Sequence, residues 1–309
     1  SYIEFDHITK EYNSGGTSIF ALKDASFSVE KGEMMALLGP NGAGKTTTLK
    51  LLSGILYPTS GEVLVNGFVP WERKNEFKRS FAIVMGQKNQ LWWDLPASDS
   101  LYLNKCIYDV DDREYKKTVD ELSELLGVRE LMNIQVRRLS LGERMKMEIL
   151  AALIHRPGIL FLDEPTIGLD IVSQQKIRDF LHYYNEQTKT TIILTSHYMR
   201  DIEALCSRAV IINSGTLVYD GALSDINHRM GDKRLLTLSF SSPVETGKLS
   251  IFGRVRENKD LTAVLEIPKE RIKETASQML SLFPVDDFTV TEVPLEESIA
   301  RIFTGEVAG

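Results

Sequence analysis

Gly39-Pro40-Asn41-Gly42-Ala43-Gly44-Lys45-Thr46 is the stretch of this sequence that decides the fold. It follows a short apolar run that ends at Leu38, and a helical pattern from Thr47 to Leu56 comes after it, so we expect a strand to enter the loop and a helix to leave it. The glycines let the backbone wrap around a phosphate group, with N–H groups and the helix N-terminus directed at the negative charge. The sequence therefore predicts a phosphate-binding loop that holds a nucleoside triphosphate.

Two side chains of this loop have distinct predicted roles. Lys45 is expected to reach the β- and γ-phosphates, and the hydroxyl of Thr46 is expected to coordinate Mg²⁺. The other residues predicted to contact the nucleotide lie in the loop and at the start of the helix: Gly39, Asn41, Gly42, Gly44 and Thr47.

A pair of acidic residues, Asp163 and Glu164, follows a second apolar run, Ile159–Leu162. Ligands of parallel sheets usually bind at the carboxyl ends of the strands, which is where this pair lies. Asp163 is placed to hold Mg²⁺ through water, and Glu164 is placed to polarise the attacking water as a general base. Loop and acidic pair together predict Mg²⁺-dependent hydrolysis of the triphosphate.

Strand-like and helical runs alternate to about residue 220, which predicts a mostly parallel α/β core. Ala25–Val29 and Met34–Leu38 flank a Lys31-Gly32 turn, and this spacing predicts a hairpin. From about residue 90 to 155 the pattern is helical, with Asp111 and Asp112 as candidate helix caps, so we expect a helical subdomain inserted in the core.

The composition changes again near Gly231-Asp232. Beyond this point Leu236, Leu238 and Phe240 alternate with polar residues, and a helical stripe of apolar residues follows. We expect a first domain over residues 1–231 and a small α+β domain over residues 232–309.

Charge and hydrophobicity limit the classes of partner. With 36 Lys+Arg against 43 Asp+Glu, the net charge is −7, which argues against a nucleic-acid partner held along an extensive phosphate-contacting face. No stretch reaches the roughly 18 apolar residues of a membrane span, so any connection to a membrane is expected to be made through a partner.

Five further motifs occur in a fixed order around the phosphate-binding loop. Tyr12 precedes the loop, Gln87 follows a strand, and Leu139-Ser140-Leu141-Gly142-Glu143 precedes a helix. Thr166-Ile167-Gly168-Leu169-Asp170 comes after the acidic pair, and Thr195-Ser196-His197 ends a strand. With these motifs in this order, residues 1–231 resemble the ATP-binding-cassette (ABC) ATPases, which implies a P-loop ABC ATPase core with a helical subdomain.

The resemblance also implies how the site works. Two chains would form a head-to-tail dimer with two ATP molecules between them, and the most direct second subunit is another copy of this chain. Lys45, Gln87, Glu164 and His197 would act in catalysis in cis, with Gln87 joining Thr46 and Asp163 around Mg²⁺. Ser140, Gly142 and Asp170 would act in trans on the site of the other subunit, and Tyr12 would stack on adenine. Leu141 and Glu143 depart from the Gly and Gln of the family's common signature, and we expect activity to survive these differences.

Transport is the leading functional expectation. The segment from Gly86 to Pro96, with the paired Trp92 and Trp93, resembles ATPase subunits of ABC-2-type exporters, including a viologen-exporter-like branch, and so does the run Leu139-Ser140-Leu141-Gly142-Glu143-Arg144. The appended domain resembles the small C-terminal domain of drug- and antibiotic-exporter ATPases. This resemblance implies a membrane permease as partner and a location at the cytoplasmic face of the membrane. The alternative is a soluble ABC ATPase that acts on a ribosome, DNA or a protein assembly; the single phosphate-binding loop and the lack of long coiled-coil insertions count against it.

Overall fold

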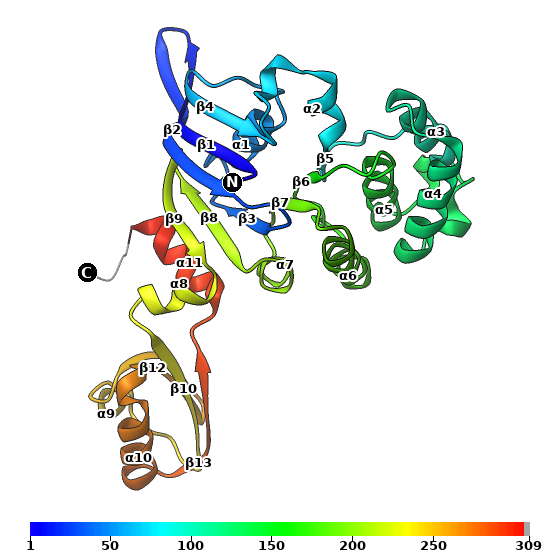
Figure 1. The fold of residues 1–309 in the computed structure, drawn as a ribbon. Helices are drawn as coiled ribbons and strands as arrows, with labels where there is room; N and C mark the ends of the chain where they lie inside the picture. Colours follow the sequence, from blue (N-terminus) through cyan, green and yellow to red (C-terminus); the bar gives the residue numbers. More distant parts are fainter. Residues whose placement is uncertain (306–309) are drawn as a thin grey trace. The chain divides into compact units, whose positions relative to one another are not determined.

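The structure is a computed structural model, and it describes residues 1–305. Contacts within the chain divide it into two units, Ser1–Leu223 and Ser224–Gly309 (Figure 1). The division falls before the helix α8 (Ser224–Arg229), whereas the sequence places the boundary after residue 231. The reason is that Asn227 of α8 bonds to the C-terminal helix, whose Ser298 hydroxyl donates to its side-chain oxygen.

A six-stranded sheet forms the centre of the first unit, in the order β5-β6-β7-β3-β8-β9. The strands are parallel except β9, which pairs antiparallel to β8. Their bounds are β3 Met34–Leu38, β5 Phe81–Met85, β6 Ile159–Asp163, β7 Thr191–Thr195, β8 Arg208–Asn213 and β9 Thr216–Ala222. Continuous apolar runs suit these strands because helices cover a parallel sheet on both faces. The predicted α/β class is confirmed.

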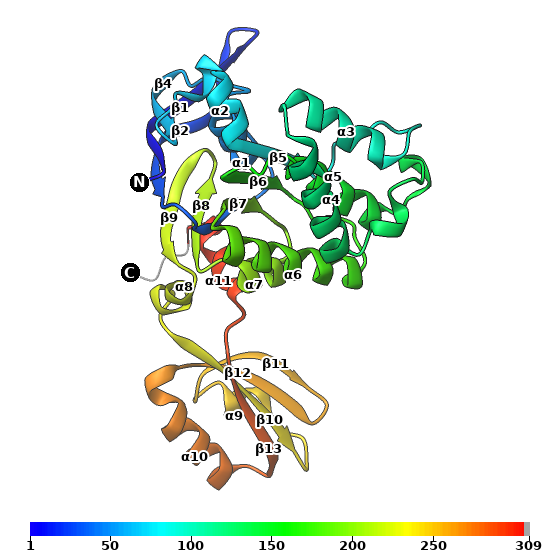
Figure 2. The same cartoon turned by 45° about the vertical axis from the view of Figure 1, so that its right-hand side comes forward.

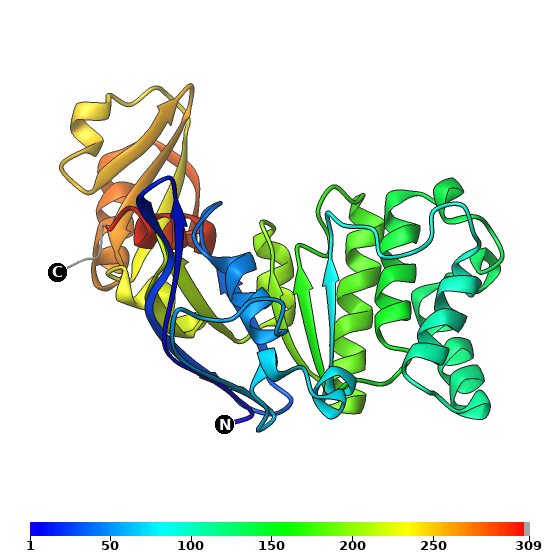
Figure 3. The same ribbon diagram turned by 90° about the horizontal axis from the view of Figure 1, so that it is seen from above.

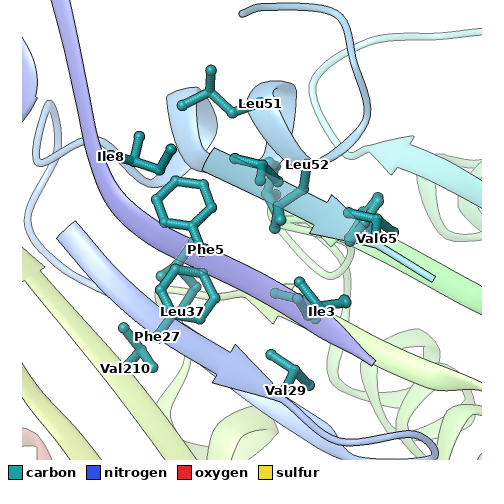
Figure 4. Close-up of a cluster of buried hydrophobic side chains, with 14 of the residues drawn as sticks. Ile3, Phe5, Ile8, Phe27, Val29, Leu37, Leu51, Leu52, Val65 and Val210 are labelled. Carbon is teal, nitrogen blue, oxygen red and sulfur yellow. The ribbon is translucent and has the colours of Figure 1, made fainter. Parts of the chain in front are cut away.

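A second, antiparallel sheet in the order β2-β1-β4 lies near the β9 edge of the first. It consists of β1 (Ile3–Ser14), β2 (Thr17–Val29) and β4 (Ser60–Val65). Phe5 pairs with Phe27 across β1 and β2, and their rings stack with centroids 4.8 Å apart. Figure 4 shows this pair facing a cluster that includes Leu51 and Leu52 of the helix α1 (Lys45–Leu52). This buried cluster fixes α1, and with it the phosphate-binding loop, against the antiparallel sheet.

The predicted hairpin of Ala25–Val29 and Met34–Leu38 is wrong. A turn does occur at Lys31-Gly32, but the strands on either side of it belong to different sheets: β2 pairs with β1, and β3 pairs with β7 and β8. Every residue of β3 is buried, whereas burial alternates along the second half of β2. The two strands therefore suit different environments, one covered on both faces and one covered on a single face.

Three helices form the group expected between residues 90 and 155: α3 (Ala97–Ile107), α4 (Asp112–Leu126) and α5 (Leu141–Ala152). They lie together beside the β5 end of the central sheet (Figures 2 and 3), and α5 contacts β5 directly. Of the two candidate caps, Asp111 is the one that caps α4, because its carboxylate accepts the N–H of Arg113 at 2.9 Å, whereas Asp112 is the first residue of the helix. The other helices of this unit are α2 (Asn75–Ser80), α6 (Ile171–Thr188) and α7 (Met199–Leu205).

The second unit contains a four-stranded antiparallel sheet in the order β11-β12-β10-β13. After α8 its elements are β10 (Lys233–Phe240), α9 (Thr246–Leu249), β11 (Arg254–Lys259), β12 (Thr262–Pro268), α10 (Ile272–Leu282), β13 (Val285–Glu292) and α11 (Leu295–Thr304). Its own hydrophobic core joins the inner face of β10 and β12 to Met279 of α10. Among residues 1–305 no helix combines the length and hydrophobicity needed to span a bilayer.

Candidate functional site

The phosphate-binding loop connects β3 to α1 as the sequence predicts. Among the residues that the structure describes, no side chain caps the first turn of α1, so its N–H groups are free to bind an anion. Lys45 is buried and donates from Nζ to the carbonyl oxygen of Gly39, at the other end of the loop. Burial lowers the pKa of Lys45, although Glu164 and Asp163 partly oppose this effect. A desolvated cation therefore lies inside the loop, where a phosphate would neutralise it.

Asp163 ends β6 and contacts hydroxyls from two other elements. Thr46 Oγ1 donates to Asp163 Oδ2 at 2.9 Å, and Thr195 Oγ1 at the end of β7 donates to Oδ1 at 2.7 Å. A hydroxyl and a carboxylate at this distance are hard oxygen ligands of the kind that Mg²⁺ prefers. The donor set fits Mg²⁺, with Gln87 exposed at the rim of the same cleft.

Contacts from two neighbouring segments fix the conformation of Glu164. Its backbone is in the left-handed region, with φ 54°, and its N–H donates to the hydroxyl of Thr195 at 3.0 Å. Its Oε2 accepts the backbone N–H of His197 at 3.1 Å, and the ring Nε2 of His197 lies 3.3 Å from Oε1. Oε1 itself is buried and accepts no hydrogen bond from any of residues 1–305.

This environment raises the pKa of Glu164. Burial raises the pKa of its carboxyl, and the nearby His197 and Lys45 offset only part of the increase. A buried carboxylate oxygen with an open lone pair and a raised pKa has the properties of a general base that accepts a proton from water.

These groups surround one cleft of about 590 Å³. Ten of the residues selected from the sequence line it: Asn41, Gly42, Gly44, Lys45, Thr46, Thr47, Gln87, Asp163, Glu164 and His197. Gly39 reaches the site through its carbonyl oxygen. Of the remaining selected residues within the described chain, Tyr12, Ser140, Gly142 and Asp170 lie outside this lining.

Tyr12 lies on β1 and its side chain is exposed. The ammonium of Lys10 lies 5.0 Å from the centre of its ring. From β2, the strand paired with β1, only Ala21 belongs to the lining of the cleft. An adenine could stack on Tyr12 only if it extended beyond the cleft toward this antiparallel sheet.

The starts of the helices α5 and α6 form a second candidate region, which contains Ser140, Gly142 and Asp170. Ser140 caps α5, since its hydroxyl accepts the N–H of Glu143 at 3.2 Å while the Glu143 carboxylate accepts the N–H of Ser140 at 2.7 Å. Asp170 caps α6 and accepts the hydroxyl of Ser173 at 2.7 Å. A Cβ on Gly142 would lie only 2.3 Å from that Ser173 oxygen, so the two helix starts are in close contact.

The structure brings to the site several residues to which the sequence analysis assigned no role of their own. Thr195 bonds both to Asp163 and to the N–H of Glu164, and Lys50 and Lys88 add two cations to the cleft lining. Thr195 directly precedes the Ser196-His197 pair, so its position at a strand end was the available signal. Nothing in the local sequence distinguishes Lys50 or Lys88 from exposed surface lysines.

Comparison with protein families gives two matches in chain order. The family model described as ABC transporter matches residues 22–167, and the model described as EvrA-like ABC transporter, C-terminal domain, matches residues 232–291. Each match lies within one of the two domains expected from the sequence.

Comparison with individual proteins also finds ATP-binding proteins of this kind. The chain is 37% identical over 206 residues to the ABC transporter ATP-binding protein NatA of Bacillus subtilis, which covers 67% of this chain and 83% of NatA. It is 34% identical over 265 residues to the linearmycin resistance ATP-binding protein LnrL of the same organism, covering 86% of this chain and 83% of LnrL. Among solved structures, the dimeric bacterial ABC transporter cassette MJ0796 superposes with a TM-score of 0.65 at 25% identity, over 71% of this chain and 98% of that one.

Proposed function

Because the chain belongs to the family of ABC transporter ATP-binding proteins, which are ATPases, we propose that it drives a membrane exporter by closing and reopening a two-subunit ATP sandwich. ATP binding closes the dimer, and hydrolysis assisted by Glu164 reopens it. The motion is passed to permease subunits, through which the chain attaches to the cytoplasmic face of the membrane.

The observation that supports hydrolysis is the environment of Glu164. Glu164 lines the same cleft as Lys45 and Asp163, and its buried Oε1 has no hydrogen-bond donor among residues 1–305, although His197 Nε2 lies 3.3 Å from it. This carboxylate is the proposed proton acceptor. Lys45 and the first turn of α1 hold the β- and γ-phosphates, and His197 stabilises charge that develops on the γ-phosphate. Thr46, Asp163 and Gln87 would hold Mg²⁺, which would neutralise phosphate charge.

A second subunit completes the site in this proposal. Ser140 and Gly142 start α5, and Asp170 starts α6, yet all three lie outside the cleft of their own chain. The Ser140 hydroxyl accepts the Glu143 N–H, and this bond does not use the hydroxyl's own hydrogen, which could therefore donate to a γ-phosphate of another subunit. The dimeric state of the similar cassette supports this arrangement.

Export through a permease rests on two observations. LnrL, which is similar over most of its length, is a resistance protein, and resistance is a common consequence of export. Trp92 and Trp93 are 48% and 45% exposed, although large aromatic side chains are usually buried or at interfaces. The guanidinium of Arg144 lies 4.5 Å from the ring centre of Trp93 and holds that ring at the surface of the helical group. These rings are the proposed contact with the permease.

The sandwich is tested with Glu164→Gln, which removes the base but preserves the shape of the side chain. We expect the variant to lose ATP turnover and to form a stable dimer in MgATP, measured by phosphate release and by light scattering. Glu124→Gln on α4, which changes the same charge outside the cleft, is the control and is expected to behave as the wild type. Wild-type turnover in Glu164→Gln would refute the role of Glu164, and a monomer at saturating MgATP would refute the sandwich.

The transport role needs a separate experiment. The tagged chain is recovered from its own cells after membranes are solubilised in mild detergent, and the proteins that accompany it are identified. We expect a stoichiometric polytopic membrane protein. Recovery only from the soluble fraction with ribosomes, nucleic acid or a soluble assembly would contradict transport and favour the soluble class of ABC ATPase.

A further inference from the structure

A buried polar cluster centred on Asp201 lies next to the catalytic segments. Asp201 on α7 and Arg178 on α6 form an ion pair in which each side chain is only 2% exposed, with Nη1 of Arg178 2.6 Å from Oδ1. An isolated buried pair is weak evidence for stability, because the desolvation of both charges offsets their attraction. Its other contacts are therefore informative about what the pair does.

The second carboxylate oxygen of Asp201 accepts two hydroxyls from two different segments. Thr166 Oγ1 donates to Oδ2 from the segment that follows Glu164, and Ser196 Oγ donates to the same Oδ2 at 3.0 Å from the segment that precedes His197. One oxygen atom thus fixes the two catalytic segments relative to each other, while Arg178 fixes the orientation of the carboxylate.

A second bridge joins the same two segments. The hydroxyl of Tyr198, next to His197, accepts the backbone N–H of Gly168 at 3.3 Å. Ser196 Oγ also accepts the N–H of Tyr198 at 3.0 Å. Hydrogen bonds therefore fix both chain neighbours of His197, Ser196 and Tyr198. The loop Thr166–Asp170 and the His197 turn therefore form one hydrogen-bonded body.

We propose that Asp201 is a positioning residue for ATP hydrolysis. Held by Arg178, it sets the placement of His197 relative to Glu164 and to the loop that ends at Asp170, through the hydroxyls of Thr166 and Ser196. This inference rests on the roles proposed above for Glu164, His197 and Asp170. A shared anchor suits a reaction in which a base and a phosphate-contacting histidine must keep a fixed geometry, because small displacements lower the rate steeply.

The test removes the two hydroxyls while it leaves the ion pair intact. Thr166→Val and Ser196→Ala are each expected to lower kcat by about tenfold or more, with the KM for MgATP within about twofold of the wild type. The double variant is expected to be no slower than the slower single variant, because both hydroxyls act through one oxygen. Thr166→Ser keeps the hydroxyl and is expected to recover most of the wild-type kcat.

A matched control separates positioning from simple loss of a buried hydrogen bond. Thr118 is as buried as Thr166 and accepts Arg156 Nε at 2.9 Å, away from the cleft, so Thr118→Val removes a comparable bond. If kcat of Thr166→Val and Ser196→Ala falls no further than kcat of Thr118→Val, or if the two losses multiply in the double variant, the shared anchor is refuted.

Wild type and Glu164→Gln are measured in the same series. If the wild type hydrolyses ATP and Glu164→Gln does not, the proposed base stands even when the anchor fails. If Glu164→Gln turns over normally, the proposed function fails by itself. A rise in KM with unchanged kcat in Thr166→Val would also overturn the positioning role.

Discussion

Gly86 tests how closely the site depends on backbone packing. It follows β5, and its N–H donates to the carbonyl oxygen of Asp163 at 2.7 Å. A Cβ at this position would lie 2.0 Å from the carbonyl oxygen of Glu164, far inside van der Waals contact. In Gly86→Ala the two backbones must therefore separate by roughly 1 Å or more, since carbon–oxygen contacts need more than 3 Å.

The displacement moves Glu164, whose conformation is fixed by several hydrogen bonds. Glu164 is held in a left-handed conformation by Thr195 and by the His197 N–H, so moving its carbonyl oxygen also moves its carboxylate relative to the loop. A misplacement of about 1 Å at a reacting group lowers the rate by about 100-fold. We expect kcat to fall by about that factor, and overpacking to lower the free energy of unfolding by about 1–3 kcal/mol.

The assay is phosphate release at saturating MgATP, together with thermal unfolding of the same preparation. Gly247→Ala is the control, because among residues 1–305 no heavy atom beyond its chain neighbours and its own helix backbone lies within 4 Å of a Cβ at Gly247, and its backbone is not in the left-handed region. We expect the control to match the wild type in both measurements. If Gly86→Ala keeps turnover within about twofold of the wild type at unchanged stability, the geometric argument is refuted.

Three more predictions follow from other contacts. Gly142→Ala places a Cβ 2.3 Å from the Ser173 hydroxyl oxygen and should lower turnover without lowering nucleotide binding to the monomer; equal loss of both, measured by titration and phosphate release, would contradict it. Because burial raises the pKa of Glu164, kcat should decline on acidification while the pH is still above 4.5, and a pH–rate profile with no decline above that value would contradict the assigned base. Burial alone would raise the pKa of Glu266, but hydrogen bonds from Arg301, Arg256 and Lys233 lower it to about 2. The resulting stabilisation is complete above pH 4.5 and is lost as the pH falls toward 2, so Glu266→Gln should flatten the pH dependence of unfolding in that window.

The elements nearest the phosphate-binding loop could be predicted because their signals are local. A strand, a glycine-rich loop and a helix follow one another directly, and the acidic pair is adjacent to its own strand. Asp111 could likewise be identified as a cap, since a cap contacts residues only two or three positions ahead.

The hairpin failed because a turn does not specify which strands pair. The Lys31-Gly32 turn exists, but β3 finds its partners at β7 and β8, more than 150 residues later. The information needed was in the burial pattern: an uninterrupted apolar run such as Met34–Leu38 suits a sheet covered on both faces, and an alternating strand such as Ala25–Val29 suits one open face. The apolar pattern and the Lys31-Gly32 turn indicate different strand pairings, and the pairings in the structure agree with the apolar pattern.

The residues around Asp201 could not be found from the sequence for a related reason. Arg178 and Asp201 lie in two different helices, and charges on helices are most often solvated. Only the contact between α6 and α7 buries both side chains, and only the parallel order of β6 and β7 brings Thr166 and Ser196 to the same carboxylate. The groups that would hold ATP are encoded in short motifs, whereas the groups that set their geometry depend on which strands and helices are neighbours, and the fold alone determines that.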